Sequence, residues 1–247
     1  ENPGDQLRLR FERVQGDTFL NHHISLTDQW QKYDIPFYVP EYADPAVGGT
    51  TKPLIFAMYV PEGKGDVWVD DVELSSADHE NPTVFSDNIV DKLNELQPGV
   101  LRDWGLQLGS SLDNQLVTEF GRKTTGHHPL DSNPSNYHYS LHDFLRLSQQ
   151  VGAEPWYVIA PTTSDEEMTN LAAYLAAPVS SGHPYALLRE EHGQTAPWTD
   201  VFPTIHLEFG NEMWGSGYGG DPFWGATVRG GQRLGQISHD RFSAVRA

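Results

Sequence analysis

The sequence contains no cysteine, which excludes a disulfide framework, a thiolate nucleophile and a cysteine-ligated zinc site. It also lacks any apolar run of the roughly 20 residues that a membrane-spanning helix needs, so no membrane partner is expected. Lysine and arginine are scarce, 16 against 34 aspartates and glutamates, and the net charge is −18. Such a chain repels a nucleic-acid backbone instead of displacing its counterions, so nucleic acid is not an expected partner either.

Aromatic residues, in contrast, are plentiful, with seven tryptophans and ten tyrosines in 247 residues. Their apolar faces and polar edges suit a flat, neutral ligand, although a well-filled core is the plainer interpretation. The length allows one or two domains. The chain begins at Glu1 with no signal peptide, so it is expected to be a processed protein or a fragment, and its acidity suits a secreted protein.

Residues 1–78 predict an antiparallel β-sandwich. Residues 7–14 and 30–37 alternate between apolar and polar side chains, as half-buried strands do. Residues 53–60 form a denser apolar run, and a Gly/Pro turn separates it from a further strand-like run at 66–74. No helical pattern interrupts these runs, which favours a sandwich.

From residue 83 the pattern changes to helices alternating with short buried strands. Ser86 predicts a helix start, and capping boxes at Ser140–Asp143 and Ser164–Glu167 predict two more. A last, glycine-interrupted helix is expected near residues 223–245. Strands are expected at residues 100–102, 155–160 and 205–209, with a weaker candidate at 115–120. This alternation predicts βα units and a parallel sheet, so the fold class is β followed by α/β.

Glu212 is the principal candidate for chemistry. The apolar run that begins at Ile205 stops at Gly210-Asn211-Glu212, as a buried parallel strand does when its C-terminal end presents a carboxyl group to a cleft. Asn211 in that position can hydrogen-bond a sugar hydroxyl while Glu212 moves a proton to or from a glycosidic oxygen. A surface glutamate beside an ordinary turn is the alternative.

Three segments resemble the first half of the catalytic barrel of retaining glycoside hydrolases of clan A, most closely the family 51 α-L-arabinofuranosidases. They are residues 96–102, 151–158 and 210–213. The resemblance implies that residues 83–247 contain strands one to four of a (β/α)8 barrel, with Glu212 as the general acid/base. It implies retaining cleavage of plant-type polysaccharides or arabinofuranosyl side chains by a secreted bacterial enzyme.

The same resemblance gives roles to other side chains near strand ends. Arg102 would position the nucleophile, against the alternative of an ion pair with Asp103 or another carboxylate, and Glu208 is expected in a structural ion pair. Trp104, Trp156 and Trp214 are candidates for stacking on a sugar, and each serves packing in the alternative interpretation.

Residues 1–78 resemble the C-terminal strands of a family 4/9-type carbohydrate-binding jelly roll. The segments that carry this likeness are residues 30–33 and 68–72. The resemblance implies a glycan platform at Trp30 or Tyr33, whereas Trp68 is expected in the core. Asp70-Asp71 are candidate ligands for a structural calcium, with a solvated turn as the alternative, and no other cofactor is expected.

A cluster of histidines invites a metal hypothesis, which the spacing does not favour. His138 and His142 lie four residues apart, but Tyr139 stands where a zinc protease helix needs a glutamate. No metal site is therefore predicted among His127, His128, His138 and His142.

The chain also departs from the pattern that it resembles. A (β/α)8 barrel takes about 250 residues, and the glutamate nucleophile of the family lies on strand seven, which has no counterpart here. Either a missing segment or a second chain is expected to complete the barrel. Arg102 is followed by Asp103-Trp104-Gly105 and not by the aromatic-Pro-Gly-Gly turn of the family. An endo-acting glucanase or xylanase is therefore an alternative, and a non-catalytic glycan-binding or structural protein that retains a half-barrel scaffold is another.

Overall fold

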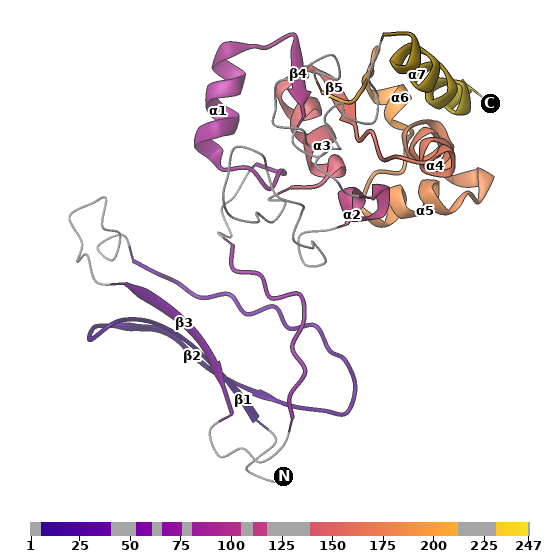
Figure 1. The fold of residues 1–247 in the computed structure, drawn as a ribbon. Coiled ribbons are helices and arrows are strands. Elements are labelled where there is room, and N and C mark those ends of the chain that lie inside the picture. The colour runs from indigo at the N-terminus through magenta and orange to yellow at the C-terminus, as the bar shows by residue number, and fades with distance from the viewer. Residues whose placement is uncertain are drawn as a thin grey trace. The chain divides into compact units, whose positions relative to one another are not determined.

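The computed structural model describes residues 6–40, 53–60, 66–75, 81–104, 111–117, 139–211 and 231–246 (Figure 1). The chain divides into two compact units, Glu1–Asp78 and His79–Ala247. Within the described ranges, no helix is both long enough and apolar enough to cross a membrane.

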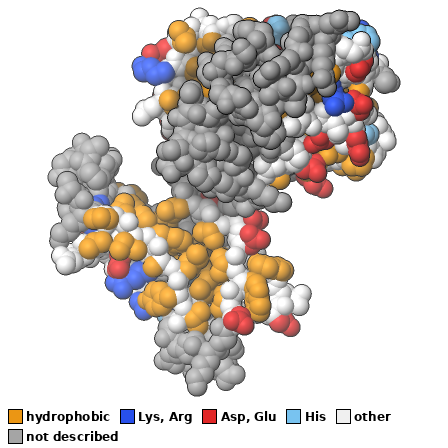
Figure 2. Space-filling model, viewed as in Figure 1, with side chains coloured by type: hydrophobic (Ala, Val, Ile, Leu, Met, Phe, Trp, Pro, Cys, Tyr) orange, Lys and Arg blue, Asp and Glu red, His pale blue; other side chains and the backbone are white. Residues whose placement is uncertain are grey.

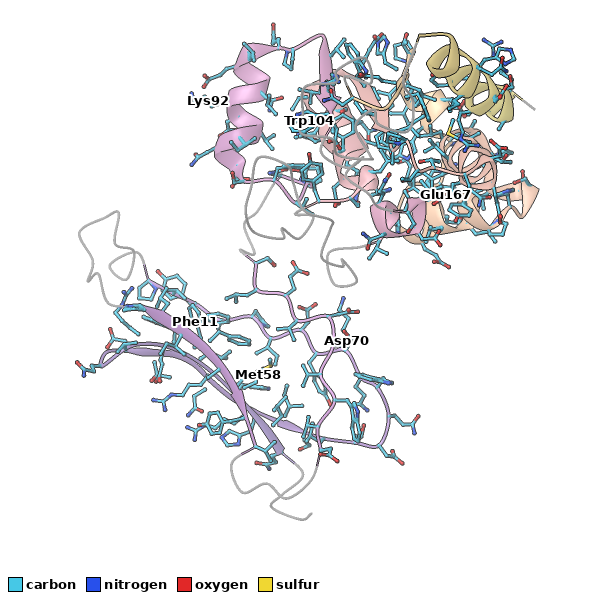
Figure 3. All side chains as sticks on the ribbon, viewed as in Figure 1. Phe11, Met58, Asp70, Lys92, Trp104 and Glu167 are labelled. Carbon is cyan, nitrogen blue, oxygen red and sulfur yellow. The ribbon has the colours of Figure 1, made fainter. Side chains whose placement is uncertain are left out.

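The first unit is built on a three-stranded antiparallel sheet. Its strands are β1 (Gln6–Arg13), β2 (Thr18–Ser25) and β3 (Leu54–Tyr59), in the order β2-β1-β3. The period-two pattern of β1 buries Leu7, Leu9 and Phe11 on one face, because alternate side chains of a strand point to opposite sides. Phe11 and Met58, both labelled in Figure 3, lie on this apolar face.

The strand predictions for this unit are partly confirmed. β1 and β3 occupy the expected runs, but the predictions at 30–37 and 66–74 are wrong, since the described residues there form no strand. A segment with period-two alternation forms a strand only when a neighbouring strand can pair with its backbone. Pro36 also removes one backbone donor. Trp68 is 74% exposed, so its predicted core position is wrong as well. The described residues thus give one antiparallel sheet, and the jelly roll stays a prediction.

The second unit contains a parallel sheet. β4 (Val100–Asp103), β5 (Glu154–Ile159) and β6 (His206–Phe209) are hydrogen-bonded in the order β4-β5-β6. The helices, shown in Figure 1, are α1 (Asp87–Leu96), α2 (Leu112–Leu116), α3 (Leu141–Val151), α4 (Asp165–Ala176), α5 (Pro184–Glu191), α6 (Trp198–Val201) and α7 (Gly231–Arg246), with a 3-10 turn, η5 (Val179–Ser181). The architecture is mixed α/β and consistent with part of a (β/α) barrel.

Helix starts follow the predicted caps. The side chain of Ser140 accepts a hydrogen bond from the backbone N–H of Asp143, whose carboxylate accepts one from the N–H of Ser140, and Ser164 and Glu167 repeat this arrangement. Ser86 stands at the start of α1, but its side chain makes no capping bond. Glu167, labelled in Figure 3, also accepts from the N–H of Leu112 at 2.9 Å and so ties α4 to α2.

The weaker strand candidate at 115–120 is wrong for its described residues, 115–117. Gln115 and Leu116 belong to α2, and residues 118–120 lie outside the described residues. β4 and β5 pair directly, so no strand lies between them. The described sheet therefore holds three of the four strands that the barrel interpretation expects.

Burial separates the two faces of the parallel sheet. Leu101, Tyr157, Ile159 and Leu207 point to one face and belong to the core that the helices complete, in which Trp198 is fully buried. The alternate residues of the same strands point to the other face and are mostly polar or partly exposed. They are Val100, Arg102, Glu154, Trp156, His206 and Glu208, with Val158 as a fully buried member. The polar and charged side chains of these strands thus lie mostly on the face opposite the helical core.

Candidate active site

The register of the parallel sheet sets the geometry of the candidate site. Arg102 pairs with Trp156, and Trp156 pairs with His206 on its other side. Glu208, two residues after His206, pairs with Val158. Because the three strands run in the same direction, their C-terminal ends meet at one edge. Long side chains on the shared face can therefore cross β5 and join β4 to β6.

Arg102 makes this crossing. Its Nε donates to one carboxylate oxygen of Glu208 at 2.9 Å, and its Nη2 donates to the other at 3.0 Å. The same Nη2 donates to Oδ1 of Asn211 at 2.7 Å. A planar guanidinium matches a carboxylate in this two-pronged way, so the pair is specific in geometry as well as in charge. The Arg102 and Glu208 side chains are 32% and 22% exposed, so the network is accessible to solvent.

Trp156 lies beneath this bridge. The Arg102 guanidinium carbon is 5.3 Å from the centre of the Trp156 ring, within the range of a cation–π contact. The His206 ring lies 6.2 Å from Trp156, and His206 Nε2 is 2.8 Å from a carboxylate oxygen of Glu154. A second polar pair therefore occupies the same face, towards the N-terminal ends of the strands.

Gly210 ends β6 and directs Asn211 towards Arg102. Its N–H donates to the carbonyl of Ile159 at 2.9 Å, which extends the ladder by one bond, and its φ is +66°. That left-handed conformation is easy for glycine and strained for other residues. The chain turns at this point, and the amide of Asn211 comes within hydrogen-bond distance of β4.

The structure brings together two of the predicted site residues, Arg102 and Asn211. The ion-pair interpretation of Arg102 is confirmed, with Glu208 as the partner, and so is the ion pair expected for Glu208. Asp103 instead points to the helix-covered face, where it is buried and accepts from the Tyr139 hydroxyl at 3.3 Å.

The other predicted site residues are Trp104, Glu212 and Trp214. Trp104, labelled in Figure 3, directly follows β4 and is half-buried. Glu212 and Trp214 lie outside the described residues, so their predicted roles stay predictions.

Sequence reasoning missed the pair of Glu154 and His206. The signal that locates it is the alternation within β5 and β6, which places Glu154, Trp156, His206 and Glu208 on one face once the register is known. The register itself depends on how two distant segments pair, and the residues of either strand alone do not reveal it.

No described residues gather as a metal site: no three His, Asp or Glu side chains among them are placed to hold an ion. His142 is buried in α3 with its Nδ1 2.7 Å from the hydroxyl of Tyr174, while His127, His128 and His138 lie outside the described residues. Asp70 accepts from the backbone N–H of Asp71 at 3.0 Å, which is the local turn contact of the plainer interpretation.

Several solved structures are similar in fold to this chain. An arabinose complex of α-L-arabinofuranosidase from Thermotoga maritima matches with a TM-score of 0.51 and 15% identity, over 68% of this chain and 34% of that one. A family 51 α-L-arabinofuranosidase from Bifidobacterium longum matches at 0.52 and 17%, over 68% and 31%. An arabinose-bound GH51 α-L-arabinofuranosidase matches at 0.58 and 13%, over 98% and 39%.

The chain has a glycoside hydrolase-like fold. It spans about a third of the length of the first solved structures that it matches, and at this identity the likeness concerns the fold alone. No family model matches the sequence, and no curated protein matches it.

Proposed function

We propose that this chain carries the acid/base half of a retaining glycosidase site, acting on arabinofuranosyl side chains or related plant-type polysaccharides. The observation that carries the proposal is the network of Arg102, Glu208 and Asn211. It stands at the C-terminal edge of a parallel sheet, where the active sites of (β/α) barrels are built. Glu212 follows Asn211 directly in the sequence.

The proposed roles follow from the chemistry of each side chain. Glu212 protonates the leaving glycosidic oxygen and later removes a proton from water, as retaining hydrolysis requires of one of its two carboxyl groups. Asn211 hydrogen-bonds a sugar hydroxyl, and Trp104 or Trp214 offers an apolar face to the ring. The second carboxyl group, the nucleophile, is supplied from outside this chain, by a further segment or a second polypeptide.

A substrate screen with an acid/base variant tests the proposal. The chain is assayed together with the segment or polypeptide that supplies the nucleophile, on p-nitrophenyl arabinofuranoside, xyloside and glucoside, and on soluble glucan and arabinoxylan. Hydrolysis of the arabinofuranoside and of arabinoxylan is expected, with the natural substrate losing about 10²- to 10⁴-fold in rate in Glu212→Gln. Full activity of that variant would refute the role of Glu212.

A second candidate is glycan binding without hydrolysis, and exposed rings in the first unit favour it. Trp30, Tyr38 and Trp68 are 73%, 76% and 74% exposed, and Figure 2 shows hydrophobic side chains gathered on the visible face of this unit. Exposed aromatic rings are suited to stacking on sugars. Arabinoxylan binding that weakens in Trp30→Ala and Trp68→Ala, but not in the exposed aliphatic control Val69→Ala, would support this candidate.

The setting proposed for both functions is the same. We place the protein outside the cell of a bacterium, with a polysaccharide or oligosaccharide as its partner, in keeping with the strongly acidic composition. Recovery of the protein from the culture medium of its source would test the location.

A further inference from the structure

The Arg102 bridge has a consequence for the amide of Asn211. Asn211 Oδ1 accepts a 2.7 Å bond from Arg102 Nη2. Turning the amide over would place its NH2 group against the guanidinium, donor against donor, so the bridge fixes which end of the amide faces Arg102. The amide nitrogen is then the end that Asn211 directs away from Arg102.

Glu208 in turn fixes Arg102. An arginine side chain has several rotatable bonds, and its position is defined only when its donors are engaged. Here two donors of one guanidinium meet the two oxygens of a single carboxylate, at 2.9 and 3.0 Å, on a strand two places away in the sheet. Trp156, beneath the guanidinium, limits its position from below. Glu208 thus fixes the position of Arg102, and Arg102 fixes the orientation of the Asn211 amide.

We infer that Glu208 is a positioning residue of this site: through Arg102 it holds Asn211 so that the asparagine meets its ligand as a hydrogen-bond donor. The ligand group opposite Asn211 is therefore an acceptor oxygen, such as a sugar hydroxyl or ether oxygen. The inference rests on the proposed function for the nature of the ligand. The orientation of Asn211 is argued from its contact with Arg102 and does not depend on the nature of the ligand.

The chain offers a matched control for this role. Glu154 lies on the same face of the same sheet and also joins two of its strands, β5 and β6, through its 2.8 Å contact with His206. Both carboxylates are partly exposed, with side-chain exposures of 33% for Glu154 and 22% for Glu208. If Glu208 only held the sheet together, neutralising either carboxylate would have the same kind of effect.

The side-chain amide resonances of Asn211, assigned by their loss in Asn211→Asp, provide the spectroscopic test. In the unaltered protein they are expected away from free-asparagine positions. In Glu208→Gln they move towards those positions, in Glu208→Asp they move part of the way, and in Glu154→Gln they stay in place. Unchanged resonances in Glu208→Gln, or equal movement in Glu154→Gln, would overturn the inference.

Steady-state kinetics provide a second test of the role of Glu208. On p-nitrophenyl arabinofuranoside, Glu208→Gln is expected to raise KM about tenfold with a smaller change in kcat, since a hydrogen bond to the sugar is weakened in both ground and transition states. If the unaltered chain, assayed with the part that supplies the nucleophile, neither binds nor cleaves the sugar, the proposed function fails, while the amide resonances still decide the role of Glu208. If Glu208→Gln does not fold, Arg102→Lys replaces it, because lysine cannot engage Glu208 and Asn211 in the same fork.

Discussion

Arg102 and Asn211, 109 residues apart in the sequence, are joined by a 2.7 Å hydrogen bond across the parallel sheet. The bond exists because β4 and β6 flank β5 in register and because Arg102 is long enough to cross one strand. The residue next in the chain after Asn211 is the proposed acid/base, Glu212. The position of Asn211 therefore depends on a contact made by β4, far away in the sequence.

Gly210 is expected to be sensitive to substitution. Gly210→Ala places a Cβ on a backbone with φ of +66°, which costs about 1–2 kcal/mol of unfolding free energy and shifts Asn211 relative to Arg102. Gly99→Ala is the control, because φ there is not positive and no atom lies within 4 Å of the added Cβ. Thermal unfolding of both variants checks this; equal midpoints for the two would contradict the strain assigned to Gly210.

The capping box of α3 predicts that Ser140 contributes more to the free energy of unfolding than Ser86 does. Ser140→Ala removes an accepted bond from the N–H of Asp143 and leaves the Asp143 carboxylate with one donor fewer, which should cost about 1–2 kcal/mol. Ser86→Ala at the start of α1 should cost well under about 0.5 kcal/mol, because the Ser86 side chain makes no capping bond. Denaturant unfolding of the two variants measures the difference. Similar losses would argue against a specific contribution from the α3 box.

His142 predicts a pH dependence of stability. Burial lowers the pKa of His142 from 6.5 to about 3, with help from the charges of His192 and Arg146. The unfolded chain therefore binds a proton between pH 6.5 and 3 that the folded chain does not. The stabilisation is complete above pH 6.5 and declines by on the order of 1.4 kcal/mol per unit as the pH falls towards 3.

The test compares slopes and not single values, since other groups titrate in the same range. Unfolding free energy is measured from pH 7 to pH 4 for the unaltered protein and for His142→Gln. His142→Gln should flatten the decline. A slope unchanged in His142→Gln would show that His142 is not the group responsible.

Arg189 is predicted to be a structural cation of α5. It is fully buried, and its guanidinium donates to the carbonyls of Tyr174, Ala177, Gln194 and Thr195 at 2.8 to 3.2 Å. Arg189→Met leaves these buried acceptors without a donor and should cost about 3–5 kcal/mol. Arg146→Met, in α3, tests whether loss of any arginine destabilises the protein to the same extent. Calorimetry of the two variants measures this difference in stability.

Local signals in the sequence predicted the second unit well. The boxes at Ser140 and Ser164 involve residues only three apart, so each can be read from one short window and each is confirmed. No helix was predicted over α5 and α6, although Pro184 at the first position of α5 and the ring nitrogen of His183 as its cap form a helix start.

Non-local features were harder to predict. β2 was missed because His22-His23 break the apolar alternation, although β2 pairs with β1 along its length. The run at 30–37 alternates but forms no described strand, since a strand needs a partner that a single segment does not specify. At the site, an ion pair for Glu208 was expected, but its partner became visible only through the register of three strands.

The leaving-group dependence of Glu212→Gln tests the central claim most directly. A general acid matters most when the departing oxygen is basic, as in a natural glycan, and least when it departs as p-nitrophenolate. The expected result is a fall of about 10²- to 10⁴-fold on arabinoxylan and a much smaller fall on p-nitrophenyl arabinofuranoside. Equal falls on both substrates would contradict proton donation by Glu212.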